Sequence, residues 1–153
     1  MNAPMLEKPD ATSLMIRRTF AADIETLWDA LTDPKAWMQW FGGGHATPVE
    51  TSADLRVGGA WRIEMRGNDS GNQIVLIGEY VEISRPDRLV FTWAWGSAPE
   101  RVSRVTYELS PGDGADETKL LLTHDRLADS DIRDSHAMGW SATLELLAAK
   151  LAK

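Results

Sequence analysis

The feature that most constrains this chain is a series of short apolar runs between residues 46 and 127, each ended by turn residues. The separating segments VGG, RGNDSGN, SRPD, GSAPE and SPGDGADE are rich in Gly, Pro, Asn and Asp, which are the residues that turns favour. Connections this short join antiparallel strands, because a parallel pair needs a crossover of roughly a dozen residues or more. The pattern therefore predicts an antiparallel meander of about six strands.

Alternation along each run predicts which side chains face the core, since successive side chains of a strand point to opposite faces. Glu79 falls in phase with the apolar residues of its strand, but Gly78 beside it can mark a bulge that turns Glu79 to solvent. Both orientations of Glu79 stay open. The residues assigned to the inner face are Trp61, Ile63, Met65, Val75, Ile77, Val81, Ile83, Leu89, Phe91, Trp93, Trp95, Val105, Tyr107, Leu109, Leu120, Leu122 and His124.

Three shorter elements precede the meander. Residues 14–21 alternate as a first strand, interrupted by Arg18 on the apolar face. Asp23 then caps a short helix whose apolar residues recur at helical spacing. A second short helix follows in DPKAWMQWFGGG (33–44), where Pro34 takes the first helical position and Gly42 stands where a left-handed residue ends a helix.

A long helical pattern, residues 129–153, closes the chain. Ser130 or Asp131 can cap it. Its apolar stripe must be buried against the sheet, because an amphipathic helix needs a partner for that face. The stripe consists of Ile132, His136, Trp140, Leu144, Leu147 and Leu151.

Composition limits the classes of protein that the chain can belong to. The 153 residues, 43% of them hydrophobic, suit one domain; we expect a flexible tail over 1–12 and a single domain over 13–153. No signal segment or membrane-spanning run is present, and the absence of cysteine excludes disulfides and favours a reducing cytoplasm. A net charge of -7 argues against nucleic acid as a partner.

Several blocks in order resemble a known family. TFAADIETLWDALTDPKAWMQWFGG, GGAWRIEMRG, GEYVEISRPDRLVFTWAW, TKLLLTHDRL and HAMGWSATLELLAAKL are similar to the family related to the C-terminal domain of the heat-shock chaperone ATPase activator, within the START-like or SRPBCC superfamily. The resemblance covers residues 14–152. It implies an α+β helix-grip fold, in which a curved antiparallel sheet of about seven strands wraps a long C-terminal helix around a cavity. The first strand would lie beside the last, and the two short helices would close one end.

Glu79 and His124 are the candidates for proton transfer. An inward Glu79 must be paired, protonated or wet, because an unpaired buried charge is costly. His124 is either a hydrogen-bonded core residue or a general base. With the family's strand order the two lie three strand spacings apart, ~14 Å along the sheet, so they do not touch, although a ligand can lie between them. Arg101, Ser103 and Arg126 share the inner face nearer the strand ends, as mouth or surface residues.

The surplus of tryptophan on the inner face predicts an aromatic-lined cavity. DPKAWMQWFGGG is core or a lid over that cavity, and at least one of its two tryptophans should touch it. A phosphate site is excluded there, because the glycines follow a helix instead of opening one. The residues expected to contact a ligand are Trp37, Trp40, Phe41, Trp61, Met65, Glu79, Phe91, Trp93, Trp95, Tyr107, His124, His136 and Trp140.

Three functions fit these observations. The first is binding of a small hydrophobic or aromatic molecule in the cavity. The second is a cyclase, dehydratase or hydrolase that uses Glu79 or His124. The third, implied by the resemblance alone, is a stress-related chaperone partner, for which the expected single domain is an unfavourable sign. We expect no metal, because His45, His124 and His136 lack a two-histidine spacing, and no cofactor; a homodimer is left open.

Overall fold

Eight strands and three helices make up residues 4–152, the part of the chain that the computed structural model describes. Residues 1–3 of the predicted tail, and Lys153 at the end of the predicted domain, lie outside this range. The elements are β1 (Met5–Asp10), β2 (Ser13–Phe20), α1 (Ile24–Thr32), α2 (Pro34–Trp40), β3 (Ala46–Ala53), β4 (Ala60–Gly67), β5 (Gln73–Ser84), β6 (Arg88–Trp95), β7 (Ala98–Pro111), β8 (Thr118–Asp125) and α3 (Ser130–Leu151).

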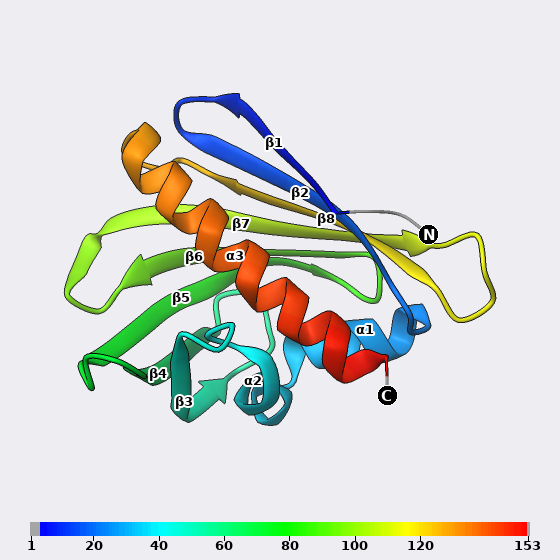
Figure 1. Ribbon diagram of the computed structural model, residues 1–153, viewed down its shortest axis with the longest axis horizontal. Coiled ribbons are helices and arrows are strands. Elements are labelled where there is room, and N and C mark those ends of the chain that lie inside the picture. The colour runs from blue at the N-terminus through cyan, green and yellow to red at the C-terminus, as the bar shows by residue number, and fades with distance from the viewer. Residues whose placement is uncertain (1–3, 153) are drawn as a thin grey trace.

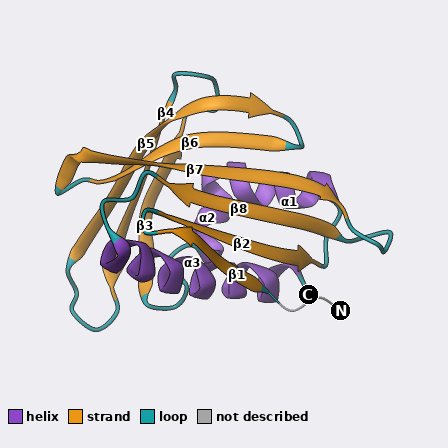
Figure 2. Cartoon of the chain, turned by 90° about the horizontal axis from the view of Figure 1, so that it is seen from above, coloured by secondary structure: helices purple, strands orange, loops and turns teal. Residues whose placement is uncertain are grey.

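The strands form a single antiparallel sheet with the order β1-β2-β8-β7-β6-β5-β4-β3. The meander from β3 to β8 and the pairing of β2 with β8 confirm the prediction. Helix α3 lies across one face of this sheet, and α1 and α2 lie beside the C-terminal end of α3 (Figure 1). Figure 2 shows the strands curving over the helices. This is the expected α+β helix-grip arrangement, with the core between sheet and helix.

Strand β1 corrects the prediction of a flexible tail over residues 1–12. Met5–Asp10 pairs with β2 in antiparallel register, with Met5 opposite Arg17 and Leu6 opposite Ile16. Its side chains are almost all exposed, because β1 is an edge strand that adds to the sheet through backbone hydrogen bonds. An exposed edge strand needs no apolar alternation, so the sequence carried little signal for it.

Strand β5 corrects the predicted inner face of the meander. The buried side chains are Leu76 and Tyr80, whereas Val81 is exposed and Glu79 lies on the solvent side. Gly78 also faces inward, because a Cβ there would collide with the indole of Trp61. A register shift between Tyr80 and Glu82 then returns the next apolar residue, Ile83, to the core side. A bulge is therefore present, but C-terminal to the predicted position.

The helix boundaries follow the capping residues. The carboxylate of Asp23 accepts from the backbone N–H of Thr26, and Asp33 starts α2 in the same way, ahead of Pro34, as predicted. Helix α3 is capped by Asp129 in place of Ser130 or Asp131. Any of these polar side chains can cap a helix, so composition alone did not decide among them.

Helix α3 is held to the sheet by its apolar stripe and by an ion pair. Arg18, on the inner side of β2, places its guanidinium 2.6 Å from the carboxylate of Glu145 on α3. This explains why a charged residue interrupts the apolar face of the first strand. No helix within residues 4–152 is both long enough and apolar enough to cross a bilayer.

Candidate functional site

A pocket of about 240 Å³ opens between α3, strands β4 to β6 and the loop after α2; we call it the mouth pocket. Its wall is largely aromatic, because the inner faces of β6 and α3 both present large rings here. Gly139 and Thr143 of α3 are small and leave space beside these rings. The large side chains of the wall are Phe41, His45, Met65, Ile74, Leu76, Trp93, Trp95, His136 and Trp140.

His136 is a buried polar group in the wall of the mouth pocket. Its ring stacks on Trp95, with centroids 5.8 Å apart and planes at 28°. It also contacts Trp93 and lies 4.6 Å from the ring of His124. Burial lowers the pKa of His136 to about 4, so the ring is neutral at pH 7. Neither of its ring nitrogens has a hydrogen bond to another residue in the range 4–152, which leaves one donor and one acceptor for a ligand.

A much smaller space, the inner cavity, lies deeper between sheet and helices and has a volume of about 20 Å³. Phe41 and Trp93 line both spaces, so these two rings form the partition between them. The rings are stacked at 28° with centroids 6.1 Å apart. The inner cavity is completed by Leu31, Trp37, Trp61, Ile63, Tyr80, Leu89, Phe91 and Tyr107.

His124 is bonded to Trp140 of the mouth pocket and belongs to a chain of buried hydrogen bonds. The indole N–H of Trp140 donates to Nδ1 of His124 at 2.9 Å. Because Nδ1 accepts, the neutral imidazole carries its proton on Nε2. Nε2 therefore donates to Oγ of Ser103 at 2.7 Å, and Ser103 donates to the carbonyl of Trp93 at 3.3 Å. Every polar atom of the imidazole is satisfied inside the core.

This arrangement makes His124 a structural residue. Burial, with a smaller contribution from His136, lowers the pKa of His124 well below its usual value. Its one free lone pair is taken by Trp140, so it cannot remove a proton from Ser103 or from a ligand. Ser103 is itself buried, against the expectation of a mouth or surface residue. The pair therefore lacks the geometry of a serine nucleophile activated by histidine.

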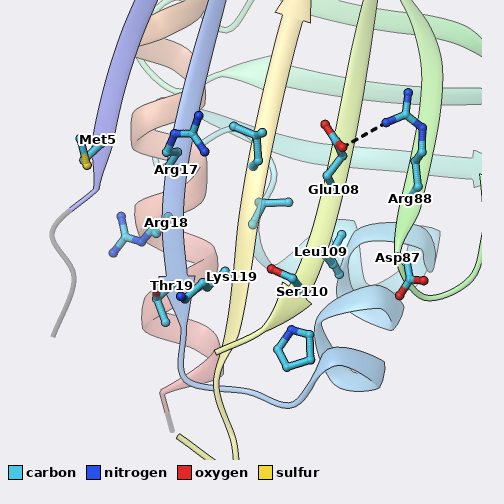
Figure 3. A pocket seen from close by; sticks show the side chains of 13 residues that line it. Met5, Arg17, Arg18, Thr19, Asp87, Arg88, Glu108, Leu109, Ser110 and Lys119 are labelled. Carbon is cyan, nitrogen blue, oxygen red and sulfur yellow. Dashed lines mark ion pairs between the residues drawn. The ribbon is translucent and has the colours of Figure 1, made fainter. Parts of the chain in front are cut away.

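A larger hollow of about 990 Å³ lies on the opposite face of the sheet. Figure 3 shows Arg17, Glu108 and Arg88 across its strands, with the ion pair between Glu108 and Arg88. Arg88 is bound by Glu82 and Glu108, and Arg17 by Glu7. Arg17 and Arg88 are thus already engaged in surface ion pairs, and no aromatic side chain of residues 4–152 lines the hollow. It therefore makes a weaker ligand site than the aromatic pocket.

Residues 21–152 match the family described as Activator of Hsp90 ATPase homolog 1-like protein. This match covers most of the chain, including every element that builds the mouth pocket. The chain belongs to this family. No curated protein is similar enough to count as a match.

Solved structures agree with this membership in the Hsp90 ATPase activator homolog 1-like family. A protein of Rhodobacter sphaeroides is 28% identical, with 98% of this chain and 99% of that chain covered and a TM-score of 0.82. The AHSA1 protein of Silicibacter pomeroyi is 28% identical, with 92% and 97% covered and a TM-score of 0.79. An HSP90 activator from Plasmodium falciparum is 24% identical over 92% and 96%, with a TM-score of 0.70; at this identity it supports the fold alone.

In this family member the structure separates the predicted ligand residues into groups. The mouth pocket and the inner cavity contain most of them. Trp37 lines the inner cavity, as predicted for one tryptophan of DPKAWMQWFGGG, whereas Trp40 is core and donates its indole N–H to the carbonyl of Ala30. Glu79 is exposed and lines neither space, and His124 is buried and bonded to Trp140 without lining either space. Of the residues near strand ends, Arg101 and Arg126 are exposed.

Several lining residues were not among the predicted ones. Tyr80 was missed because the phase of β5 was misassigned. Gly139 and Thr143 were missed because their small side chains do not contribute to the apolar stripe of the helix. They stand three and seven positions after His136, on the same side of a helix. That spacing is a signal that could have found them. In residues 4–152 no three His, Cys, Asp or Glu side chains are grouped closely enough to hold a metal ion.

Proposed function

We propose that this protein binds a small, mainly apolar molecule with an aromatic ring in the mouth pocket. The observation that carries the proposal is an aromatic-walled pocket of about 240 Å³ with an unpaired neutral imidazole in its wall. Pockets for small molecules are mostly apolar, with a few polar groups that fix the orientation of the ligand. The volume is below the usual range of about 300–1,000 Å³, so the ligand would be small, with one or two rings.

Gly139 supports the proposal because it weakens the helix without improving the packing. A glycine in the interior of a helix destabilises it by about 0.5–1 kcal/mol relative to alanine. No atom of a neighbouring residue would lie within 4 Å of a Cβ at this position, so close packing does not require a glycine. The space that Gly139 leaves open is part of the mouth pocket.

The stack of Trp95 on His136 indicates how a ring would be held. Trp95 is 39% exposed and stands at the open side of the pocket, where a ring of the ligand can cover it. Stacked aromatic pairs gain about 0.5–1.5 kcal/mol beyond the area that they bury. The neutral imidazole can donate to or accept from one polar group of the ligand.

Native mass spectrometry of the protein mixed with a metabolite extract tests this proposal. We expect the wild type to retain a small molecule that quenches tryptophan fluorescence when it is added back alone. Gly139→Leu adds a side chain at the edge of the pocket without a collision at its Cβ, and should reduce the amount of the retained species. Met138→Leu is the matched control, because Met138 directly precedes Gly139 in the same helix and is 76% exposed.

Two results would contradict the proposal. One is that the wild type retains no small molecule from any extract. The other is that Gly139→Leu and the wild type retain the same molecule equally, which would place the binding site elsewhere.

A further inference from the structure

Two buried hydrogen-bonding groups beside the inner cavity have no partner in residues 4–152. They are the hydroxyl of Tyr80 and the indole N–H of Trp93, whose residues are only 3% and 6% exposed. Both side chains line the inner cavity. Native proteins leave few buried polar groups unsatisfied, and each one calls for an explanation such as a bound molecule.

Both groups are suited to donate a hydrogen bond. The indole N–H of Trp93 can only donate. Burial raises the pKa of Tyr80, so its hydroxyl stays protonated at neutral pH and can donate as well. One carbonyl or ether oxygen has two lone pairs and can accept from both donors at once.

The inner cavity is separated from the mouth pocket by a thin partition. Phe41 and Trp93 line both spaces. Trp93 lies inside the ring cluster, against Trp61, His136 and other rings on several sides. Phe41 also packs on rings, but it stands at the C-terminal cap of α2, directly before Gly42, which has a φ of 93°. Phe41 is therefore the side whose rotation would join the two spaces.

We propose that the ligand of the mouth pocket carries a hydrogen-bond acceptor oxygen, a carbonyl or an ether, which passes Phe41 and accepts from Trp93 and Tyr80 in the inner cavity. This inference rests on the proposed function and narrows it to aromatic ketones, aldehydes, esters and ethers. The cavity volume of about 20 Å³ suits a small acceptor group or one water molecule, and the two are distinguished by experiment.

Two probes of nearly the same shape provide the test. 2-Acetylnaphthalene carries a carbonyl where 2-ethylnaphthalene carries a methylene, and both can be followed by quenching of tryptophan fluorescence. We expect the wild type to bind 2-acetylnaphthalene about fivefold more tightly or better, the effect of one or more neutral hydrogen bonds. In Tyr80→Phe this preference should shrink, while the affinity for 2-ethylnaphthalene, the internal control for folding, stays the same.

The indole N–H of Trp93 gives a second measurement on the unmodified protein. Its ¹H–¹⁵N resonance is identified as the one missing in Trp93→Phe. It should move downfield when 2-acetylnaphthalene binds and should stay in place with 2-ethylnaphthalene, because only the carbonyl accepts a hydrogen bond.

The outcomes separate this inference from the proposed function. If both probes bind with equal affinity and Tyr80→Phe changes neither, a water fills the inner cavity and the acceptor inference is overturned, while binding in the mouth pocket stands. An unmoved Trp93 resonance with both probes bound has the same meaning. If neither probe binds to the wild type, the inference fails together with the proposed class of ligand.

Discussion

Ser103 is the acceptor for the protonated nitrogen of His124, so the contribution of its hydroxyl can be measured with a single substitution. Ser103→Ala leaves Nε2–H of His124 buried without a partner. An unsatisfied buried donor costs about 1–3 kcal/mol, and we expect the free energy of unfolding in urea to fall by that amount. Ser110→Ala, at an exposed position of the same strand, should change it by less than about 0.5 kcal/mol. Equal losses in both variants would contradict the hydrogen-bonded chain.

Acid should weaken the fold through His124 and His136. Burial lowers both pKa values, that of His136 to about 4, so below about pH 6.5 the unfolded chain binds protons that the folded chain does not. The free energy of unfolding should therefore fall as the pH drops from about 7.5 to about 5, by about 1–2 kcal/mol for His136, with a further loss from His124. Urea unfolding at several pH values measures this slope.

His136→Phe is the control for the pH effect. It removes one of the two buried imidazoles and should lower the slope between about pH 7.5 and pH 5, leaving the contribution of His124. A slope that does not change in this variant would mean that His136 already carries a proton in the fold.

The residues of the pocket could be predicted where a strand or helix has one apolar face. Trp93, Trp95 and His136 were found this way, since the inner faces of β6 and α3 are both marked by large side chains. Tyr80 could not be found, because β5 carries apolar residues on both faces and places Gly78 in its inner series. Hydrogen bonds such as that from Trp140 to His124 join distant elements, and no local pattern encodes them.

The loop after α2 is an element whose glycines differ in their surroundings. Gly43 and Gly44 have positive φ values of 58° and 84°. A Cβ at Gly43 would lie 2.7 Å from the backbone of Ala142 and Thr143 in α3, whereas a Cβ at Gly44 meets nothing within 4 Å. Close contact with the helix, together with the turn itself, therefore explains the glycine at Gly43.

Alanine substitutions in this loop should separate the two effects. Gly44→Ala should cost about 1 kcal/mol, from the left-handed backbone alone. Gly43→Ala adds a collision with helix backbone and should cost about 2–4 kcal/mol in urea unfolding. If the two variants lose the same free energy, the loop does not pack on α3 as closely as the structure shows.

Elements with strong apolar periodicity and distinct capping residues at their ends were predictable. Elements defined only by backbone pairing with another strand were not. Helix α2 was bounded correctly because Asp33, Pro34 and Gly42 mark its ends with different chemistry. Strand β1 was missed because an exposed edge strand is specified by the backbone of β2 and not by its own side chains. Register is a property of two strands together, so a single run cannot show a bulge such as the one after Tyr80.

At the scale of the whole molecule, one aromatic cluster joins the sheet to helix α3 and to α2 with the residue that follows it. Trp93 of β6 contacts Phe41 beside α2, Trp61 of β4 and Trp140 of α3. Six of the seven tryptophans are buried, and only Trp95 is exposed. Side chains packed this closely transmit a local loss to their neighbours, so the fluorescence of these tryptophans reports on the entire core.

We expect the protein to unfold in a single cooperative step. Tryptophan fluorescence and far-ultraviolet circular dichroism should give the same midpoint in urea. Single domains of up to about 150 residues usually unfold this way, and this chain of 153 residues is close to that size. Trp93→Phe leaves a void in the cluster and should lower both midpoints together, by about 1–3 kcal/mol in free energy of unfolding. If α3 melted first, the two signals would separate, and more so in Trp93→Phe. The pocket would then lie between units of unequal stability, and ligand binding would have to supply the order that the aromatic cluster does not.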